Sequence, residues 1–148
     1  MKKLLVAAAA VVALSASALE VGVNGVESSA QNHRYGSGLT VGESFGGVGL
    51  TAGYTRLYRE ADDQTRWSLV ADKSLVKVGP VDVTGRVGYA YLDNETSRDG
   101  SAVTVGAGAS VDLTKKVSLG VSIDRQYGQT RVDQFNGNIV TAGIKVGF

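Results

Sequence analysis

The chain has 148 residues, and its 15 Lys and Arg residues against 14 Asp and Glu residues give a formal net charge of +1 at pH 7. A nucleic-acid partner is not expected, because binding to phosphates would require a basic surface. Cysteine is absent and the only histidine is His33. Disulfides are therefore excluded, and neither a transition-metal site nor a cofactor is expected.

The first eighteen residues predict a cleaved export signal. Met1-Lys2-Lys3 is basic, an unbroken apolar run follows from Leu4 to Leu14, and Ala16-Ser17-Ala18 fits the small-residue cleavage rule. This apolar run is shorter than the roughly 20 residues that a helix needs to cross a bilayer. We therefore expect residues 1–18 to be removed, and residues 19–148 to form one exported domain.

Beyond this signal the chain alternates with a period of two and shows no sustained helical period. The alternation predicts eight strands, at residues 19–28, 37–45, 48–58, 65–76, 81–93, 101–112, 117–127 and 138–148. Each has about the 9–11 residues that a tilted strand needs to cross a bilayer. Short and longer connections alternate, so we expect an up-and-down antiparallel barrel with its short turns and both termini periplasmic and its longer loops outside the cell.

Pairing across the two tightest turns supports this path, because cross-strand partners must share a face. Centring the turn at 77–80 on Gly79 pairs Trp67 with Tyr91. The same register pairs Asp72 with Arg86, so that an acid meets a base. The hairpin predicted at Gly46-Gly47 likewise pairs apolar residues with one another.

The distribution of glycine decides which face points outward. One face carries most of the glycines, such as Gly22, Gly106 and Gly143, whereas the other carries mainly Val, Leu and Ile. Glycine would weaken a solvent-exposed outer surface without return. Inside a narrow barrel it makes room for larger side chains. The sequence therefore predicts an all-β, eight-stranded transmembrane barrel with its apolar face toward lipid, rather than a soluble barrel of the lipocalin or streptavidin kind.

Aromatic residues are sorted by strand end, as membrane interfaces require. We expect an outer aromatic girdle formed by Tyr35, Tyr54, Tyr58, Trp67, Tyr89, Tyr91 and Tyr127. Phe45 and Phe148 fall at the opposite, periplasmic end, and Phe135 is left in the last loop.

The last predicted strand ends on an aromatic residue and presents one continuous apolar face. This face comprises Val140, Ala142, Ile144, Val146 and Phe148. A strand ending in this way is similar to the signal that the assembly machinery of bacterial outer-membrane barrels recognises. We therefore expect that machinery to be a partner during biogenesis.

Together, the export signal, the eight strands, the alternating connections, the girdle and the terminal Phe148 resemble the small OmpA/OmpX-type outer-membrane barrels. The resemblance covers residues 19–148 and implies a monomer surrounded by outer-membrane lipids and lipopolysaccharide. It is specific for architecture and says little about biochemical role, because such barrels serve as anchors, adhesins, narrow channels and lipid-modifying enzymes.

Charged side chains on the inward face are the candidates for any function beyond membrane residence. The candidate network comprises Arg66, Asp72, Arg86, Asp124 and Lys145. In one hypothesis, Arg86 exchanges acidic partners and opens a thin water path, as in a porin-like channel. In the other, the network is a static plug, because eight strands enclose little more than their own side chains.

Two further functions have sequence features to support them. Lipid A modification would need His33 beside a serine and an acid, and Ser28, Ser29, Asp93, Glu95 and Ser97 are the candidates, although none stands at a diagnostic spacing. Recognition by the loops would use their mixed charges. We expect a non-enzymatic barrel with a structural or minimally conducting role, and surface adhesion is the alternative.

Overall fold

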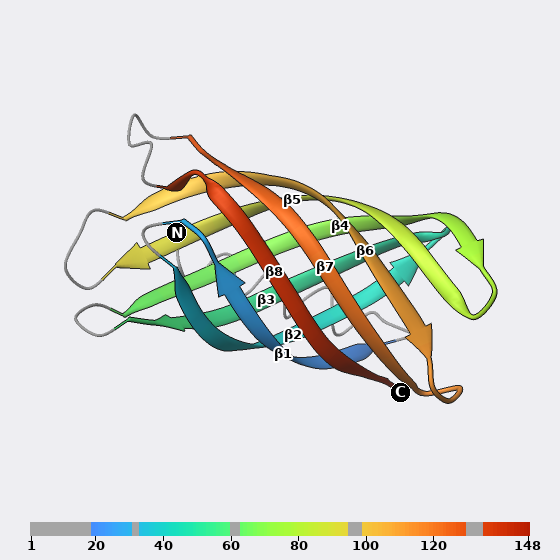
Figure 1. Cartoon of the computed structure of the whole chain (residues 1–148). Coiled ribbons are helices and arrows are strands. Elements are labelled where there is room, and N and C mark those ends of the chain that lie inside the picture. The colour runs from blue at the N-terminus through green and yellow to red at the C-terminus, as the bar shows by residue number, and fades with distance from the viewer. Residues whose placement is uncertain (1–18, 31–32, 60–62, 95–98, 130–134) are drawn as a thin grey trace.

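The computed structural model describes residues 19–30, 33–59, 63–94, 99–129 and 135–148. These residues form one closed antiparallel barrel, which confirms the predicted fold class (Figure 1). Its strands are β1 (Glu20–Ser28), β2 (Arg34–Phe45), β3 (Val48–Tyr58), β4 (Gln64–Val78), β5 (Val81–Asn94), β6 (Gly100–Asp112), β7 (Val117–Gly128) and β8 (Gly137–Gly147). Among the described residues, no helix is long and apolar enough to span a bilayer.

The two ends of the barrel differ in their connections. The tight connections at residues 46–47, 79–80 and 113–116 lie at one end, which we call the turn end, and the longer connections lie at the other, the loop end (Figure 1). At the turn end the backbone N–H of Phe148 donates to the carbonyl of Leu19 at 3.0 Å, so the first and last described residues meet there. The predicted export signal lies outside the described residues.

The register agrees with the pairs expected from the sequence, including Trp67 with Tyr91 and Asp72 with Arg86. The predicted Gly46-Gly47 hairpin forms, and both glycines adopt the positive φ angles, 55° and 82°, that a two-residue hairpin favours. The next turn is shorter than expected. A β-bulge between Ser74 and Val76 shifts the register by one residue, so β4 extends to Val78 and only residues 79–80 remain in the turn.

β2 starts earlier than predicted, at Arg34 rather than at residue 37. Arg34 pairs with Ser28 of β1, and Tyr35 pairs with both Glu27 and Tyr58. Both neighbouring strands continue to this height, so their backbone groups hold the additional residues in the sheet. Gly36 interrupts the alternation of side chains but does not interrupt the hydrogen-bonded ladder.

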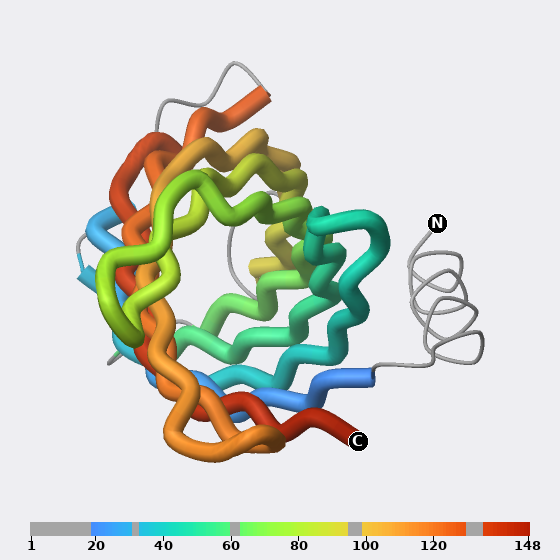
Figure 2. The backbone as a smooth tube through the Cα atoms, turned by 90° about the vertical axis from the view of Figure 1, so that its right-hand side faces the viewer, coloured from blue at the N-terminus to red at the C-terminus, as the bar shows by residue number. Residues whose placement is uncertain are grey.

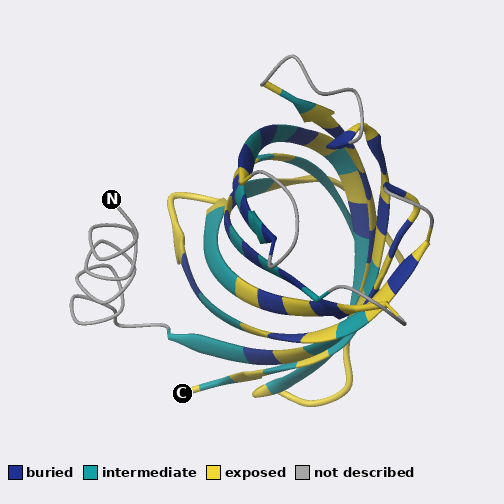
Figure 3. Cartoon of the chain, turned by 90° about the vertical axis from the view of Figure 1, so that its left-hand side faces the viewer, coloured by how far each residue is buried: buried dark blue, intermediate teal, exposed yellow. Residues whose placement is uncertain are grey.

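Burial alternates along the strands, as the alternation in sequence predicts (Figure 3). Outward positions on β1, β5, β6 and β7 carry exposed apolar residues such as Val23, Val87, Val105 and Ile123. Their inward neighbours are mostly small or polar. The apolar surface of this barrel is therefore its outer wall, which is the arrangement of a membrane barrel rather than of a soluble one.

Candidate functional site: the barrel lumen

At the loop end, buried polar side chains such as Arg34, Gln64 and Gln126 share the lumen with buried apolar side chains. The apolar side chains form two buried clusters, which together we call the loop-end plug: Val26, Leu57 and Ile139 in one, and Leu92, Ala102 and Phe135 in the other. Ala102 and Phe135 are 0% exposed, and the most exposed member, Val26, is only 7% exposed. The six plug residues are therefore almost completely shielded from solvent.

Phe135 occupies a place that the sequence reasoning did not assign to it. The prediction left Phe135 in the last loop, but its ring lies against Gly100 of β6, where any Cβ would overlap it. The side-chain amide of Gln126 also donates to the carbonyl of Phe135 at 2.8 Å. Loop residues thus enter the lumen, because fully burying an aromatic ring stabilises the fold by about 1.5–3 kcal/mol relative to leaving it exposed.

A charged cluster lies next to the plug. Nε of Arg86 donates to Oδ1 of Asp124 at 3.1 Å, and the two side chains are 22% and 8% exposed. Their strands are not neighbours: Arg86 of β5 is opposite Gly106 of β6, which is opposite Asp124 of β7. Because Gly106 has no side chain, the two charges can meet above its backbone.

Arg66 of β4 is the second cation of this cluster. It is only 8% exposed and interacts electrostatically with both Asp124 and Arg86. The cluster therefore holds two guanidinium groups around one carboxylate. Ser122 also donates to the other oxygen of Asp124, at 3.5 Å.

Among the described residues, neither Asp72 nor Lys145, the other two members of the predicted network, forms an ion pair with this cluster. Asp72 is the register partner of Arg86, but the ion pair in the structure is between Arg86 and Asp124. Nζ of Lys145 lies 3.5 Å from Oε2 of Glu20, the first residue of β1, at the turn end.

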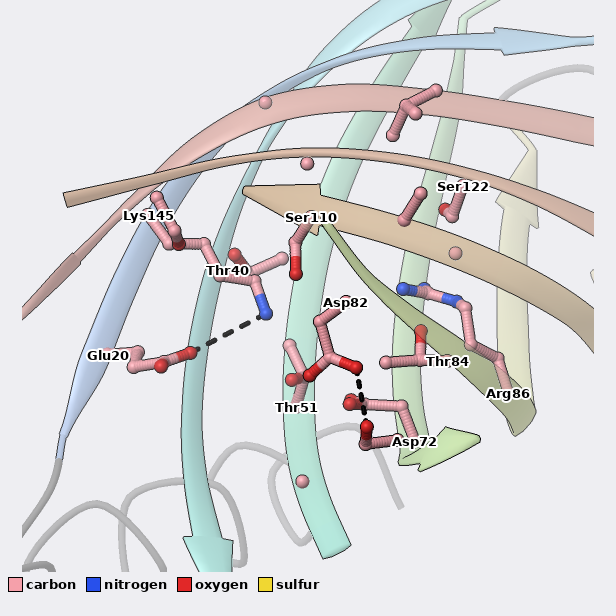
Figure 4. A pocket seen from close by; sticks show the side chains of 18 of the residues that line it. Glu20, Thr40, Thr51, Asp72, Asp82, Thr84, Arg86, Ser110, Ser122 and Lys145 are labelled. Carbon is pink, nitrogen blue, oxygen red and sulfur yellow. Dashed lines mark hydrogen bonds and ion pairs between the residues drawn. The ribbon is translucent and has the colours of Figure 1, made fainter. Parts of the chain in front are cut away.

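Viewed from the turn end, the backbone closes into a ring (Figure 2). Within it, the lumen opens at the turn end into a polar cavity of about 390 Å³, which we call the vestibule (Figure 4). Its walls carry small hydroxyl residues such as Thr40, Thr84 and Ser110, and Arg86 reaches it from the charged cluster. None of the six plug residues lines it. The lumen is thus a cup that is open at the turn end and filled at the loop end.

The residues predicted to contact the membrane lie on the outer wall. The seven girdle aromatics all occupy outward positions toward the loop end, and the rings of Tyr54 and Trp67 meet edge to face at 4.6 Å. Val140, Ala142, Ile144 and Val146 of β8 are outward as well, and Phe148 beyond them is 74% exposed. Their roles at the interface and in assembly remain predictions.

Of the serines proposed as partners of His33, the two that the structure describes make other contacts. Nδ1 of His33 lies 3.8 Å from a carboxylate oxygen of Glu27, and the histidine side chain is 68% exposed. Ser28 is buried inside the barrel, and the hydroxyl of Ser29 accepts a hydrogen bond from the backbone of Asn138. Glu95 and Ser97 lie outside the described residues. Within the described part of the chain, no group of His, Asp and Glu is arranged to hold a metal ion.

Comparison with known families identifies the chain. The family model described as "YfaZ precursor" matches residues 1–127. The chain belongs to the YfaZ family. A search of curated proteins finds no match to this YfaZ-family chain.

Solved structures similar to the YfaZ-family barrel are small outer-membrane proteins. Neisserial surface protein A superposes with a TM-score of 0.68 at 15% identity, over 88% of this chain and 96% of that one. OprG of Pseudomonas aeruginosa gives 0.63 at 10% identity, over 90% and 96%. Ail of Yersinia pestis, solved in a bilayer nanodisc, gives 0.59 at 13% identity, over 88% and 99%. The barrel therefore has the fold of small outer-membrane proteins, and at these identities the likeness extends to the fold alone.

Proposed function

We propose that this YfaZ-family chain is a structural outer-membrane barrel that does not conduct in its resting state. The loop-end plug is the observation that carries the proposal. Its side chains, including Leu57 and Phe135, are almost fully buried at the height of the loops, and we infer that they keep water from crossing the lumen there. Ions and small solutes would need a continuous polar path, and the vestibule ends below the plug.

The gating hypothesis places the exchange of partners at Arg86. Arg86 has an acidic residue on each side. Asp72 is its direct register partner on β4, and Asp124 lies on β7, beyond Gly106 of β6. A move of Arg86 from Asp124 to Asp72 would rearrange the floor of the vestibule. It would not displace the apolar plug, which lies closer to the loops, so we favour the static barrel.

The orientation that we propose puts the turn end in the periplasm and the loop end outside the cell. The short connections at one end and the longer ones at the other support it, because outer-membrane barrels share this asymmetry. In this orientation the vestibule faces the periplasm. The barrel is proposed to act as a monomer without catalytic activity.

Planar-bilayer recording tests the proposal. We expect the purified wild-type barrel, and a vestibule control Ser110→Ala, to give no resolved conductance steps. The double variant Leu57→Ala/Phe135→Ala should give resolved conductance steps, because it removes two buried side chains from the loop-end plug. Heat-modifiable migration on gels confirms that each variant is folded. Stable conductance steps from the wild-type barrel would refute the closed lumen.

Recognition through the loops is the alternative function. Mixed charges at the loop end support it, including the ion pair of Arg56 with Asp63 at 2.9 Å. One structural neighbour, Ail, is named an attachment invasion locus protein. Transfer of the loops to another small barrel tests this alternative, which fails if no cell-binding activity moves with them.

A further inference from the structure

Two strands of the barrel carry the same short motif at the loop end. Arg56-Leu57-Tyr58 ends β3, and Arg125-Gln126-Tyr127 lies near the end of β7. In each motif the middle residue is buried in the lumen, so Arg and Tyr share the outer wall. The guanidinium carbons of Arg56 and Arg125 lie 5.6 Å and 5.9 Å from the ring centroids of their tyrosines.

The two arginines differ in what balances their charge. Nη2 of Arg56 binds Oδ2 of Asp63 at 2.9 Å. Nη1 of Arg125 donates instead to the neutral amide oxygen of Asn138, at 3.1 Å. Within the described ranges no carboxylate pairs with Arg125. Among the described residues, its guanidinium therefore has a neutral hydrogen-bond partner and no counter-charge.

The position of Arg125 indicates what kind of ligand could reach it. Along β7 the outward residues Leu119, Val121 and Ile123 are all exposed and apolar, and Arg125 is the next outward residue. Val105, its cross-strand neighbour on β6, is exposed and apolar too. Arg125 thus lies where the apolar wall ends, at the level of lipid headgroups. A lipid-facing charge costs only about 0–1 kcal/mol at that level, against about 2–4 at the bilayer midplane.

Asn138 is held in place to assist Arg125. Its backbone N–H donates to the hydroxyl of Ser29 at 2.8 Å, and its carbonyl accepts from the backbone N–H of Ser29 at 2.9 Å. Because the side-chain oxygen of Asn138 accepts from Arg125, its NH₂ group remains free to donate outward. A guanidinium beside an amide donor, over the ring of Tyr127, matches the oxygens of a phosphate.

We propose that Arg125, Tyr127 and Asn138 form a site on the outer wall that binds a phosphate of lipid A. The inference rests on the proposed orientation, in which the loop end lies in the outer leaflet where lipopolysaccharide resides. Arg56 does not form an equivalent site, because Asp63 already occupies its guanidinium and would repel a second anion. The chain therefore contains its own matched control for the proposed site.

Native mass spectrometry of the purified, detergent-solubilised full barrel measures the binding. The probe is bis-phosphorylated lipid A, compared with dephosphorylated lipid A and with phosphatidylglycerol. We expect Arg125→Gln to weaken binding of bis-phosphorylated lipid A about tenfold, the loss expected for one charge-assisted hydrogen bond. Arg56→Gln should change binding less than about twofold, as for an exposed pair.

Three results would overturn the site. They are equal binding by Arg125→Gln and Arg56→Gln, equal affinity of the wild type for lipid A with and without its phosphates, and an equal dependence on Arg125 for phosphatidylglycerol. Heat-modifiable migration of every variant shows whether the barrel is intact. Loss of the site can therefore be distinguished from failure of the proposed structural barrel, and neither result depends on conductance.

Discussion

Asp124 is the lumen residue whose replacement should destabilise the barrel most, because its one carboxylate serves the buried cation Arg66 and the partly buried cation Arg86. In Asp124→Asn the side chain keeps its size, but Arg66 and Arg86 lose their anion and face each other. Removing one partner from a buried ion pair costs about 3–5 kcal/mol. Arg86→Gln leaves Arg66 beside Asp124, so that variant should cost only about 1–3 kcal/mol.

Urea-induced unfolding in lipid vesicles measures this difference. Trp67 is the only tryptophan of the chain and lies on the outer wall, so its fluorescence follows unfolding without an added probe. The double variant Asp124→Asn/Arg86→Gln completes the cycle. We expect it to be more stable than the sum of the single effects by about 1 kcal/mol or more, because it removes one of the two repelling cations.

Equal destabilisation by Asp124→Asn and Arg86→Gln would refute this reasoning. It would mean that Arg66 does not depend on Asp124, and that the cluster is a simple pair of Arg86 with Asp124. Strict additivity in the double variant would also refute it, because it would mean that Arg86 and Asp124 are not energetically coupled at all.

Three further predictions concern other parts of the barrel. Phe148→Ala should slow insertion in a membrane-assembly assay while the unfolding free energy of assembled barrel changes little, and wild-type assembly kinetics would contradict the predicted signal. Gly106→Ala should destabilise the barrel by about 1–3 kcal/mol in urea titration, because the added Cβ would overlap Asp124 and a backbone carbonyl. The control Gly120→Ala should not destabilise it, because a Cβ there makes only ordinary contacts. Equal effects of the two substitutions would contradict the close approach at Gly106. Lys145→Met should cost less than about 1 kcal/mol in the same titration, since its pair with Glu20 is partly exposed, and a larger loss would indicate a buried pair.

The strand count, the register and the outward apolar face could all be predicted because they depend on local alternation and tight turns. Trp67 pairs with Tyr91 as expected, since the nearby turn fixes the register of its own hairpin. The bulge at residues 74–76 was not predicted. An extra residue in the exposed apolar end of β4 leaves the alternation on both sides intact, so the sequence pattern does not reveal it.

The interior at the loop end could not be predicted from alternation. Leu57 and Ile139 point into the lumen, but the outward face of their strands also carries apolar residues. An apolar residue at this end of a strand therefore does not show whether its position is inward or outward. Phe135 reaches the lumen from a connection, and no periodicity reports such a contact. The partner of Arg86 was within reach of sequence reasoning: extending the register by two more strands, through Gly106 of β6, leads to Asp124 of β7.

Because the lumen is a cup, a reagent can reach its interior from one end of the barrel and not from the other. Ser110 lies in the vestibule, which opens only at the turn end, and the chain contains no cysteine (Figure 4). A thiol introduced as Ser110→Cys would therefore be the single reactive group, and the loop-end plug would shield it from one side of the membrane. Labelling by a maleimide that cannot cross membranes would then depend on which compartment the reagent occupies, so the lumen itself would report how the barrel is oriented.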